Sequence, residues 1–346
     1  MPKPEIASLE LEVDRFAGCL VGQALGDALG FIVEGRSPSE CAAYVEHALR
    51  PRRLLGYSRG RFPIGQYSDD SQLARELVRS FVERRQFDPA DYAARIAALF
   101  TEGRIVGRGR ATEEAAYRIA SGVPWQDAGT PAPAAGNGSA MRAAPIGLFF
   151  WDDPEAMVAA AHDQGRITHR DPRCSAGAIA IAGATAIVMK EREVHPGSLC
   201  STLSRWTRAF DPVLAEALED LPRWIRLPPH RAVETIASTG VEPSYTEGWH
   251  GISPFVTGSV LWSLYSVLRS PSDYWEVICS AIGVGGDVDT TAAMAGAISG
   301  ASVGLARIPI EPARLVSDQG EWGYGQLVQL ARECHAVHHQ RRSSGT

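Results

Sequence analysis

Hydrophobic residues recur every three or four positions along most of the chain, the spacing of one face of an α-helix. The clearest apolar stripe consists of Leu73, Leu77, Val78, Phe81 and Val82. No segment alternates strictly between apolar and polar residues, as a half-buried strand would. The pattern therefore predicts an all-α fold, in which residues 89–100 form a further helix.

Two predicted helices are rich in small residues. Within residues 14–30, glycines fall at every fourth position (18, 22, 26 and 30) and share one stripe. Because each glycine inside a helix costs about 1 kcal/mol relative to alanine, this stripe predicts the close approach of another helix or of a ligand. The longest apolar run, residues 176–189, is shorter than a membrane-spanning helix of roughly 20 residues and is predicted to be a buried core helix.

No low-complexity linker or internal repeat divides the 346 residues. We therefore expect one compact domain over residues 14–338, an N-terminal extension over 1–13 and a disordered tail over 339–346. The protein is expected to be a monomer.

The net charge and the cysteine pattern indicate which partners and which kinds of site the protein is expected to lack. The net charge is −6 and no basic stripe is present, which argues against a nucleic-acid partner. No signal-peptide pattern opens the chain, and no membrane association is expected. The six cysteines are scattered without a Cys-x-x-Cys pair, so neither a zinc site nor a disulfide framework is indicated. These features predict a cytoplasmic protein.

Two acidic clusters stand directly before predicted helices. One is Ser68-Asp69-Asp70, and the other is Asp287-Val288-Asp289-Thr290, which follows two glycines. Hard oxygen donors of this kind suit Mg²⁺, Mn²⁺ or Ca²⁺. Adjacent carboxylates also repel each other unless a cation or hydrogen-bond donors neutralise them.

A simpler interpretation is that these residues cap helices. Asp70 or Ser71 could be the N-cap of the first helix, and Asp289 or Thr290 could cap the second. One cap explains one residue in each cluster and leaves the other oxygen donors unexplained.

Two glycine-containing turns could bind an anion at a helix N-terminus. They are Gly107-Arg108-Gly109, which by itself is better explained as a plain loop, and the segment 136–142, which could equally be an ordinary turn. Neither follows a predicted strand, so neither is a dinucleotide-binding fingerprint.

Three isolated residues have open interpretations. By itself, Glu34 is best explained as a solvated loop charge. His169 is best explained as a cap of the following helix rather than a site residue. Trp249 lies between two glycines and could be a mobile pocket wall or a buried side chain.

Taken in order, these segments resemble the motifs of the ADP-ribosylglycohydrolases. The resemblance spans roughly residues 14–307 and rests on Gly26-Asp27-Ala28-Leu29-Gly30 with Glu34, Ser68-Asp69-Asp70, Gly136-Asn137-Gly138-Ser139-Ala140-Met141-Arg142, Thr168-His169 and Gly286-Asp287-Val288-Asp289-Thr290.

The resemblance implies an all-α fold with two divalent ions, Mg²⁺ or Mn²⁺, in a central cleft. The implied metal ligands are Ser68, Asp69, Asp70, Asp287, Asp289 and Thr290. The implied catalytic residues are Glu34, Asp69 and Asp289. The implied substrate-binding residues, which include those facing the diphosphate, are Gly107, Gly109, Asn137, Gly138, Ser139, Met141 and His169.

The implied reaction is hydrolysis of the glycosidic bond at C1″ of ADP-ribose, which releases ADP-ribose from a modified protein side chain or a small acceptor. Relatives that act on ADP-ribosyl-arginine commonly have an aspartate in the loop corresponding to residues 105–111, where this chain has no carboxylate. A guanidinium leaving group would lack that partner. The alternatives are a two-metal hydrolase of a nucleotide or phosphate ester, and a non-catalytic structural relative.

Overall fold

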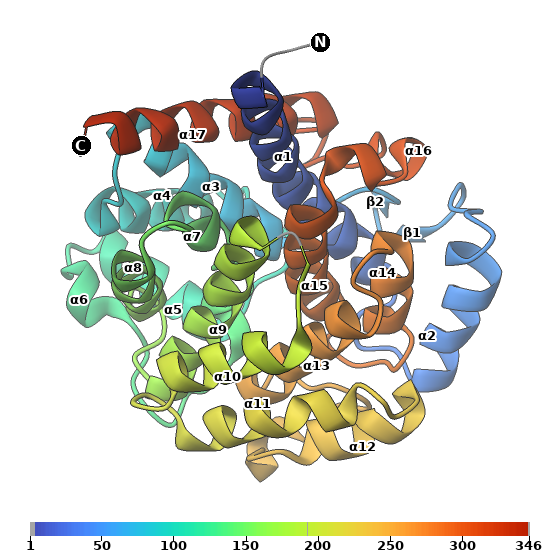
Figure 1. The fold of residues 1–346 in the computed structure, drawn as a ribbon. Helices are drawn as coiled ribbons and strands as arrows, with labels where there is room; N and C mark the ends of the chain where they lie inside the picture. The colour runs from blue at the N-terminus through green and yellow to red at the C-terminus, as the bar shows by residue number, and fades with distance from the viewer. Residues whose placement is uncertain (1–3, 192, 345–346) are drawn as a thin grey trace.

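The structure is a computed structural model and describes residues 4–191 and 193–344. Over these residues the fold is helical, as predicted, with one short hairpin (Figure 1). The α-helices are α1 (Pro4–Phe31), α2 (Pro38–Tyr44), α3 (Asp69–Arg84), α4 (Pro89–Thr101), α5 (Arg110–Ala120), α6 (Trp125–Ala128), α7 (Ala144–Phe149), α8 (Pro154–Arg166), α9 (Pro172–Lys190), α10 (Pro196–Thr207), α11 (Pro212–Trp224), α12 (Pro229–Ser238), α13 (Val256–Arg269), α14 (Tyr274–Ile282), α15 (Val288–Val303), α16 (Ile310–Ala313) and α17 (Tyr324–Ser344). Short π or 3₁₀ turns are η1 (Val45–Leu49), η2 (Asn137–Ser139), η3 (Pro243–Tyr245) and η4 (Leu305–Arg307), and the strands are β1 (Ser58–Arg59) and β2 (Phe62–Pro63).

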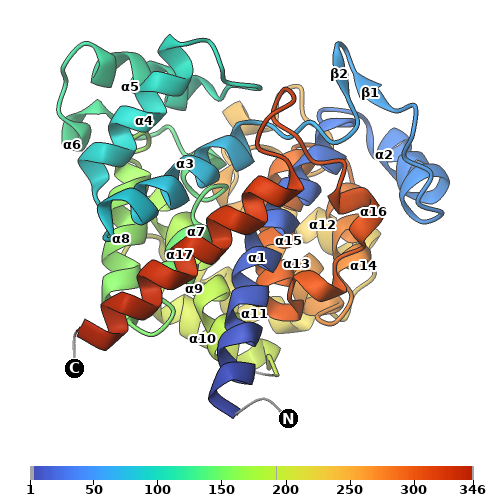
Figure 2. The same cartoon turned by 90° about the horizontal axis from the view of Figure 1, so that it is seen from above.

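Helices α1 and α15 form the centre of the fold and pack along their length (Figures 1 and 2). A Cβ atom on Gly22 would lie 2.4 Å from the Gly296 carbonyl oxygen, and one on Gly300 would lie 2.0 Å from that of Gly18. The backbones therefore approach so closely that only glycine fits at these positions. The glycine stripe correctly predicted a close helix neighbour.

Substituting Gly300 by alanine should destabilise the fold. The added methyl group meets backbone atoms that cannot move aside, so we expect a loss of about 2 kcal/mol or more in the free energy of unfolding, despite the better helix propensity of alanine. Urea unfolding of G300A measures the loss. G325A is the matched control, because a Cβ on this exposed helical glycine has no atom within 4 Å; equal stability of the two variants would contradict the packing argument.

Helix α9 is the predicted buried core helix. It packs against α7, α8, α10, α13 and α15, and its side chains from Cys174 to Met189 are buried. Among the described residues it is also the one helix long and apolar enough to span a membrane, but 83% of its most apolar window is buried inside the fold. All six cysteines are buried free thiols, as expected.

Both predicted chain ends require correction. Helix α1 runs from Pro4 through residue 14 without a break, so the expected boundary lies inside one helix. Helix α17 continues to Ser344, where a disordered tail had been expected from residue 339. Its last turns are held because Arg342 pairs with Asp152 at 3.1 Å and Arg341 lies 4.5 Å over the Phe150 ring. Residues 345–346 of the expected tail lie outside the described part.

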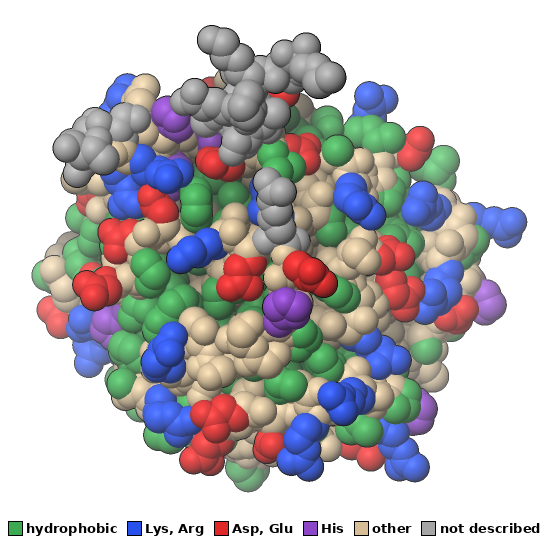
Figure 3. All heavy atoms as spheres, viewed as in Figure 1, with side chains coloured by type: hydrophobic (Ala, Val, Ile, Leu, Met, Phe, Trp, Pro, Cys, Tyr) green, Lys and Arg blue, Asp and Glu red, His purple; other side chains and the backbone are tan. Residues whose placement is uncertain are grey.

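The antiparallel hairpin β1–β2 projects beside α2 (Figure 2). Lysine and arginine side chains alternate with aspartate and glutamate over the face seen in Figure 3, so this face carries no single-sign stripe.

Candidate active site

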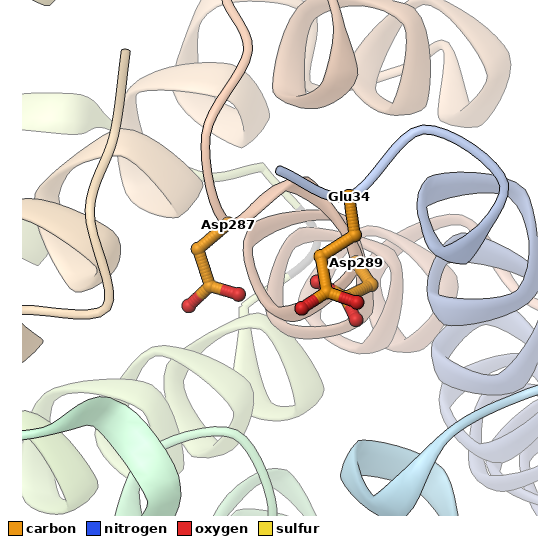
Figure 4. Close-up of side chains that lie close together, drawn as sticks. All are labelled: Glu34, Asp287 and Asp289. Carbon is orange, nitrogen blue, oxygen red and sulfur yellow. The ribbon is translucent and has the colours of Figure 1, made fainter. Parts of the chain in front are cut away.

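Three carboxylates from two distant segments converge at the start of α15. Oxygen atoms of Glu34, Asp287 and Asp289 lie within 4.8 Å of one another, and the side chains point toward a common centre (Figure 4). Glu34 lies just after α1, and its loop is tied down by the Gly35 amide, which donates to the Gly286 carbonyl at 2.9 Å. Glu34 is therefore a site residue and not the solvated loop charge favoured by its sequence context.

The two glycines before Asp287 set the direction of its side chain. Gly286 has a φ of +97°, and a Cβ there would lie 2.0 Å from the Ile252 carbonyl oxygen. The same carbonyl accepts the Asp287 amide at 2.7 Å. Asp287 is the N-cap residue of α15, yet no cap hydrogen bond is made by its side chain. The capping interpretation is therefore wrong for this cluster, and the carboxylates face the cleft.

The second acidic cluster begins α3. Ser68, rather than Asp70 or Ser71, is the N-cap, because its hydroxyl accepts the Asp70 amide at 3.4 Å. The same hydroxyl donates to Asp70 Oδ2 at 2.8 Å, and Ser68 is not among the described residues that line the cleft. In this structure Ser68 orients a carboxylate, and its expected role as a metal ligand stays a prediction.

Asp27 of α1 holds the backbone of this cluster in place. Its buried carboxylate accepts the amides of Ser68 at 2.9 Å and Ser71 at 3.0 Å. The sequence motif contained Asp27 but gave it no role, because its two partners lie more than 40 positions away.

Both clusters open into one cleft with a volume of about 660 Å³. This is within the usual range for a small-molecule site and suits a ligand of nucleotide size. Of the predicted site residues, the cleft is lined by Glu34, Asp69, Asp70, Gly107, Gly109, Asn137, Gly138, Met141, His169, Asp287, Asp289 and Thr290.

One predicted anion-binding turn leads into α5. Gly109 is the N-cap residue without a side-chain cap, so the first amides of α5 are left for another acceptor. Gly107 has a φ of +73°, and a Cβ there would lie 2.8 Å from Asp69 Oδ1. Gln72 of α3 accepts the Val106 amide at 2.8 Å, which anchors this turn to the acidic cluster.

The other turn, η2, supports the metal side of the cleft as well as the ligand side. Asn137 Nδ2 donates to Asp287 Oδ2 at 2.5 Å and to Ser259 Oγ at 2.9 Å. Ser139 is fully buried, and its hydroxyl donates to the Cys174 carbonyl at 2.8 Å. The expected hydroxyl contact from Ser139 to a diphosphate is therefore corrected, because this side chain is already used inside the fold.

His169 lines the cleft and does not cap α9. The cap is Asp171, which accepts the Arg173 amide at 2.9 Å. Burial, together with the positive charge of Arg142, lowers the pKa of His169 to about 3. The ring is therefore neutral at ordinary pH.

Sequence reasoning missed several contributors. Tyr245 lines the cleft beside the half-buried Trp249, for which a place in a pocket wall was one of two predicted roles. Arg59 of the hairpin forms an ion pair with Glu34 and donates to the Phe31 carbonyl at 2.8 Å. Nothing in the local sequence around Arg59 would identify this contact, because Glu34 lies 25 positions earlier in the chain.

The carboxylates are held in an environment that disfavours their charge. Burial raises the pKa of Asp69 to about 7, with further increases from Asp27 and Glu34, and raises that of Asp287 to about 6. Burial and neighbouring carboxylates raise the pKa values of Asp70 and Asp289 well above the ordinary value.

Two buried oxygen atoms, Asp70 Oδ1 and Asp289 Oδ1, have no hydrogen-bond partner among the described residues. Unpaired buried carboxylate oxygens are costly unless a cation completes them. The donor set contains only oxygen atoms, which fits Mg²⁺ or Mn²⁺ rather than zinc. The residues present therefore fit a divalent metal site.

These features define a helical protein with an acidic, nucleotide-sized cleft. The sequence model of the ADP-ribosylglycohydrolases matches residues 8–344. The chain therefore belongs to the ADP-ribosylglycohydrolase family and is a glycosidic-bond hydrolase.

Named relatives and a solved structure agree with this assignment. The chain is 31% identical over 333 residues to ADP-ribosylhydrolase ARH3 of Gallus gallus, covering 85% of this chain and 87% of the relative. It is 27% identical over 307 residues to the ADP-ribosyl-[dinitrogen reductase] glycohydrolase of Rhodospirillum rubrum, covering 86% and 88%. A solved ADP-ribosylglycohydrolase-related protein complex matches with a TM-score of 0.69 at 25% identity, covering 95% of this chain and 99% of that one.

Proposed function

We propose that the protein is a divalent-metal-dependent hydrolase that cleaves the glycosidic bond at C1″ of an ADP-ribosylated acceptor and releases ADP-ribose. The observation that carries this proposal is the convergence of two acidic clusters and two anion-binding turns on one cleft of about 660 Å³. The acidic clusters can hold metal ions that assist cleavage of a glycosidic bond, and the two turns offer backbone amides that can bind a diphosphate.

The acidic end of the cleft is the proposed site of bond cleavage. Asp69, Asp70, Asp287, Asp289 and Thr290 would hold the divalent ions, for which we expect two. When bound, such ions supply Lewis acidity toward the ribose and toward a water molecule.

Glu34 is half-buried between this end of the cleft and solvent, with Arg59 fixing its carboxylate. We assign Glu34 as the base that takes the proton of the attacking water, with Asp69 and Asp289 orienting the reacting groups.

The part of the cleft lined by the two turns is the proposed binding site for the ADP portion. The diphosphate would lie on the amides of Gly138 and Ser139 and at the start of α5, where the helix dipole favours negative charge. Tyr245 and Trp249 offer flat aromatic surfaces for the adenine.

The acceptor is proposed to be a modified protein side chain or a small ADP-ribosyl metabolite other than ADP-ribosyl-arginine. The cleft loop 105–111 has no carboxylate that could pair with a guanidinium leaving group, and its Arg108 and Arg110 are paired with Glu113 and Glu114. We further propose that the protein acts as a cytoplasmic monomer.

Metal removal tests the proposal. Wild-type protein should release free ADP-ribose from a defined ADP-ribosylated substrate, should lose this activity after EDTA treatment, and should regain it with Mg²⁺ or Mn²⁺. Liquid chromatography of products from a panel of arginine-, serine- and nucleobase-linked ADP-ribose identifies the acceptor. Release of inorganic phosphate instead of ADP-ribose would favour a phosphate-ester hydrolase, and full activity after exhaustive chelation would exclude metal dependence.

A further inference from the structure

A buried arginine without a carboxylate partner lies beneath the ligand-binding end of the cleft. Arg142 is fully buried, and among the described residues no acidic group lies within ion-pair distance of it. Its Nη1 atom also has no hydrogen-bond partner in the described part of the chain. The proposed function does not use this residue, yet so costly a group needs a reason to be there.

The hydrogen bonds of Arg142 connect it through Thr168 to His169, which lines the cleft. Its Nη2 atom donates to Thr168 Oγ1 at 2.7 Å and to the Gln164 carbonyl at 3.0 Å. Thr168 Oγ1 lies 2.8 Å from Nδ1 of His169. We call Arg142, Thr168 and His169 the buried relay.

The available donors and acceptors fix the direction of the hydrogen bond between Thr168 and His169. A guanidinium can only donate, so Thr168 Oγ1 accepts from Arg142. Thr168 is fully buried, and His169 Nδ1 is the other hydrogen-bond partner of its hydroxyl among the described residues. The hydroxyl proton therefore goes to Nδ1, because the reverse arrangement would leave a buried O–H without an acceptor.

A neutral ring that accepts at Nδ1 carries its proton on Nε2. That atom faces the ligand-binding turn, since a Cβ on Gly138 would lie 3.2 Å from His169 Nε2 and one on Gly136 would lie 3.7 Å from it. The low pKa of His169, which follows from burial and from Arg142, agrees with a neutral ring.

We propose that Arg142 and Thr168 are positioning residues that fix His169 as the Nε2–H tautomer, so that the ring donates a hydrogen bond to a phosphate oxygen held at the Gly136–Gly138 turn. The inference rests on the proposed function for the identity of the ligand. The same network supports the turn itself, because Gln164 Oε1 accepts from Arg142 Nε at 3.0 Å while Gln164 Nε2 donates to the Ser139 carbonyl at 2.9 Å.

The tautomer can be measured directly. A two-bond ¹H–¹⁵N correlation spectrum of the ligand-free wild-type protein should show an unprotonated Nδ1 and a protonated Nε2 for His169, identified by its absence from the spectrum of His169→Gln. A protonated Nδ1 would overturn the proposal. Because this measurement needs neither ligand nor metal, it tests the relay even if the protein does not bind ADP-ribose, in which case the proposed function fails separately.

Binding tests the consequence. Thr168→Val removes the hydroxyl at nearly constant volume, and calorimetry with ADP-ribose should show a dissociation constant about tenfold or more higher, the effect of one charge-assisted hydrogen bond. In turnover, KM should rise with kcat little changed, because the contact is made in ground and transition states alike. Thr168→Ser keeps the hydroxyl and should restore affinity to within about twofold of wild type.

Thr185→Val is the matched control, because Thr185 is equally buried but donates to the Ile181 carbonyl within α9. It should bind ADP-ribose like the wild type. Wild-type affinity in a folded Thr168→Val variant, or an equal loss in Thr185→Val, would overturn the proposal.

Discussion

Asp289→Asn should abolish turnover while leaving the helical fold intact. Removing a residue that only supports a metal ligand typically costs 10–100-fold, so loss of a ligand itself should cost more than about 100-fold. Asp69→Asn should behave in the same way, because its carboxylate lines the same cleft. Single-turnover release of ADP-ribose under limiting Mg²⁺ measures the effect.

The same variants should not be less stable than metal-free wild type. Asp289 Oδ1 is buried without a partner, and the charge of the side chain is disfavoured by burial and by Glu34, Asp287 and Asp70. An amide removes this repulsion and can donate to a neighbouring carboxylate. Thermal unfolding in EDTA should therefore place Asp289→Asn at or above the melting temperature of the wild type.

Asp211→Asn provides the matched control for both measurements. Asp211 is also a buried aspartate whose pKa is raised by burial, but it caps α11 and does not line the cleft. Asparagine is an equally good N-cap, so turnover and stability should both be unchanged. Wild-type turnover in Asp289→Asn, or a comparable loss in Asp211→Asn, would show that the assignment of the acidic cluster is wrong.

The stabilisation that Mg²⁺ gives to the protein should increase strongly between pH 5 and pH 8. Burial raises the pKa of Asp27 and Asp69 to about 7 and that of Asp287 to about 6, from the ordinary value of 3.8. Between about pH 4 and pH 7, the unfolded chain has therefore lost protons that the metal-free folded state still holds. Stability falls with pH wherever the folded state binds more protons, so the metal-free protein is penalised as pH rises through this window.

A bound cation offsets this loss of stability at higher pH. The ligands must be ionised to bind the cation, so binding releases their protons and is favoured as pH rises. The pKa of Asp69 lies about two units above pH 5, and one pKa unit corresponds to about 1.4 kcal/mol. The difference in free energy of unfolding between Mg²⁺-loaded and EDTA-treated protein should therefore grow by at least about 3 kcal/mol from pH 5 to pH 8. Differential scanning calorimetry of both forms at each pH gives this difference.

Comparing the Mg²⁺-loaded and EDTA-treated forms also removes the opposing effect of buried histidines on stability. Burial lowers the pKa values of His162 and His338, which destabilises the fold at low pH with or without metal. That contribution cancels in the difference. A metal effect that is constant with pH, or that is retained in Asp289→Asn, would contradict the proposed role of these carboxylates.

The sequence by itself determined the helical class and pointed to the acidic segments that meet in the cleft. Helical periodicity identified α3, and the glycine stripe of α1 identified a close helix contact, because both depend on spacing within one segment. The acidic clusters were recognisable because three oxygen-bearing side chains within three or four positions exceed what a cap requires. The resemblance to the ADP-ribosylglycohydrolases joined these segments into one site, and the match over residues 8–344 confirmed the family.

The tertiary structure alone decided what each polar side chain contacts. The Ser139 hydroxyl donates to the Cys174 carbonyl, 35 positions away, and is thereby unavailable to a ligand, while Asn137 reaches Asp287 across 150 positions. Asp27 could not be identified as the support of the Ser68–Ser71 segment, nor Arg142 as the partner of Thr168, from either local sequence. Local spacing determines which face of a helix is apolar, but the partner of a buried hydrogen-bonding group depends on which distant segment folding places beside it.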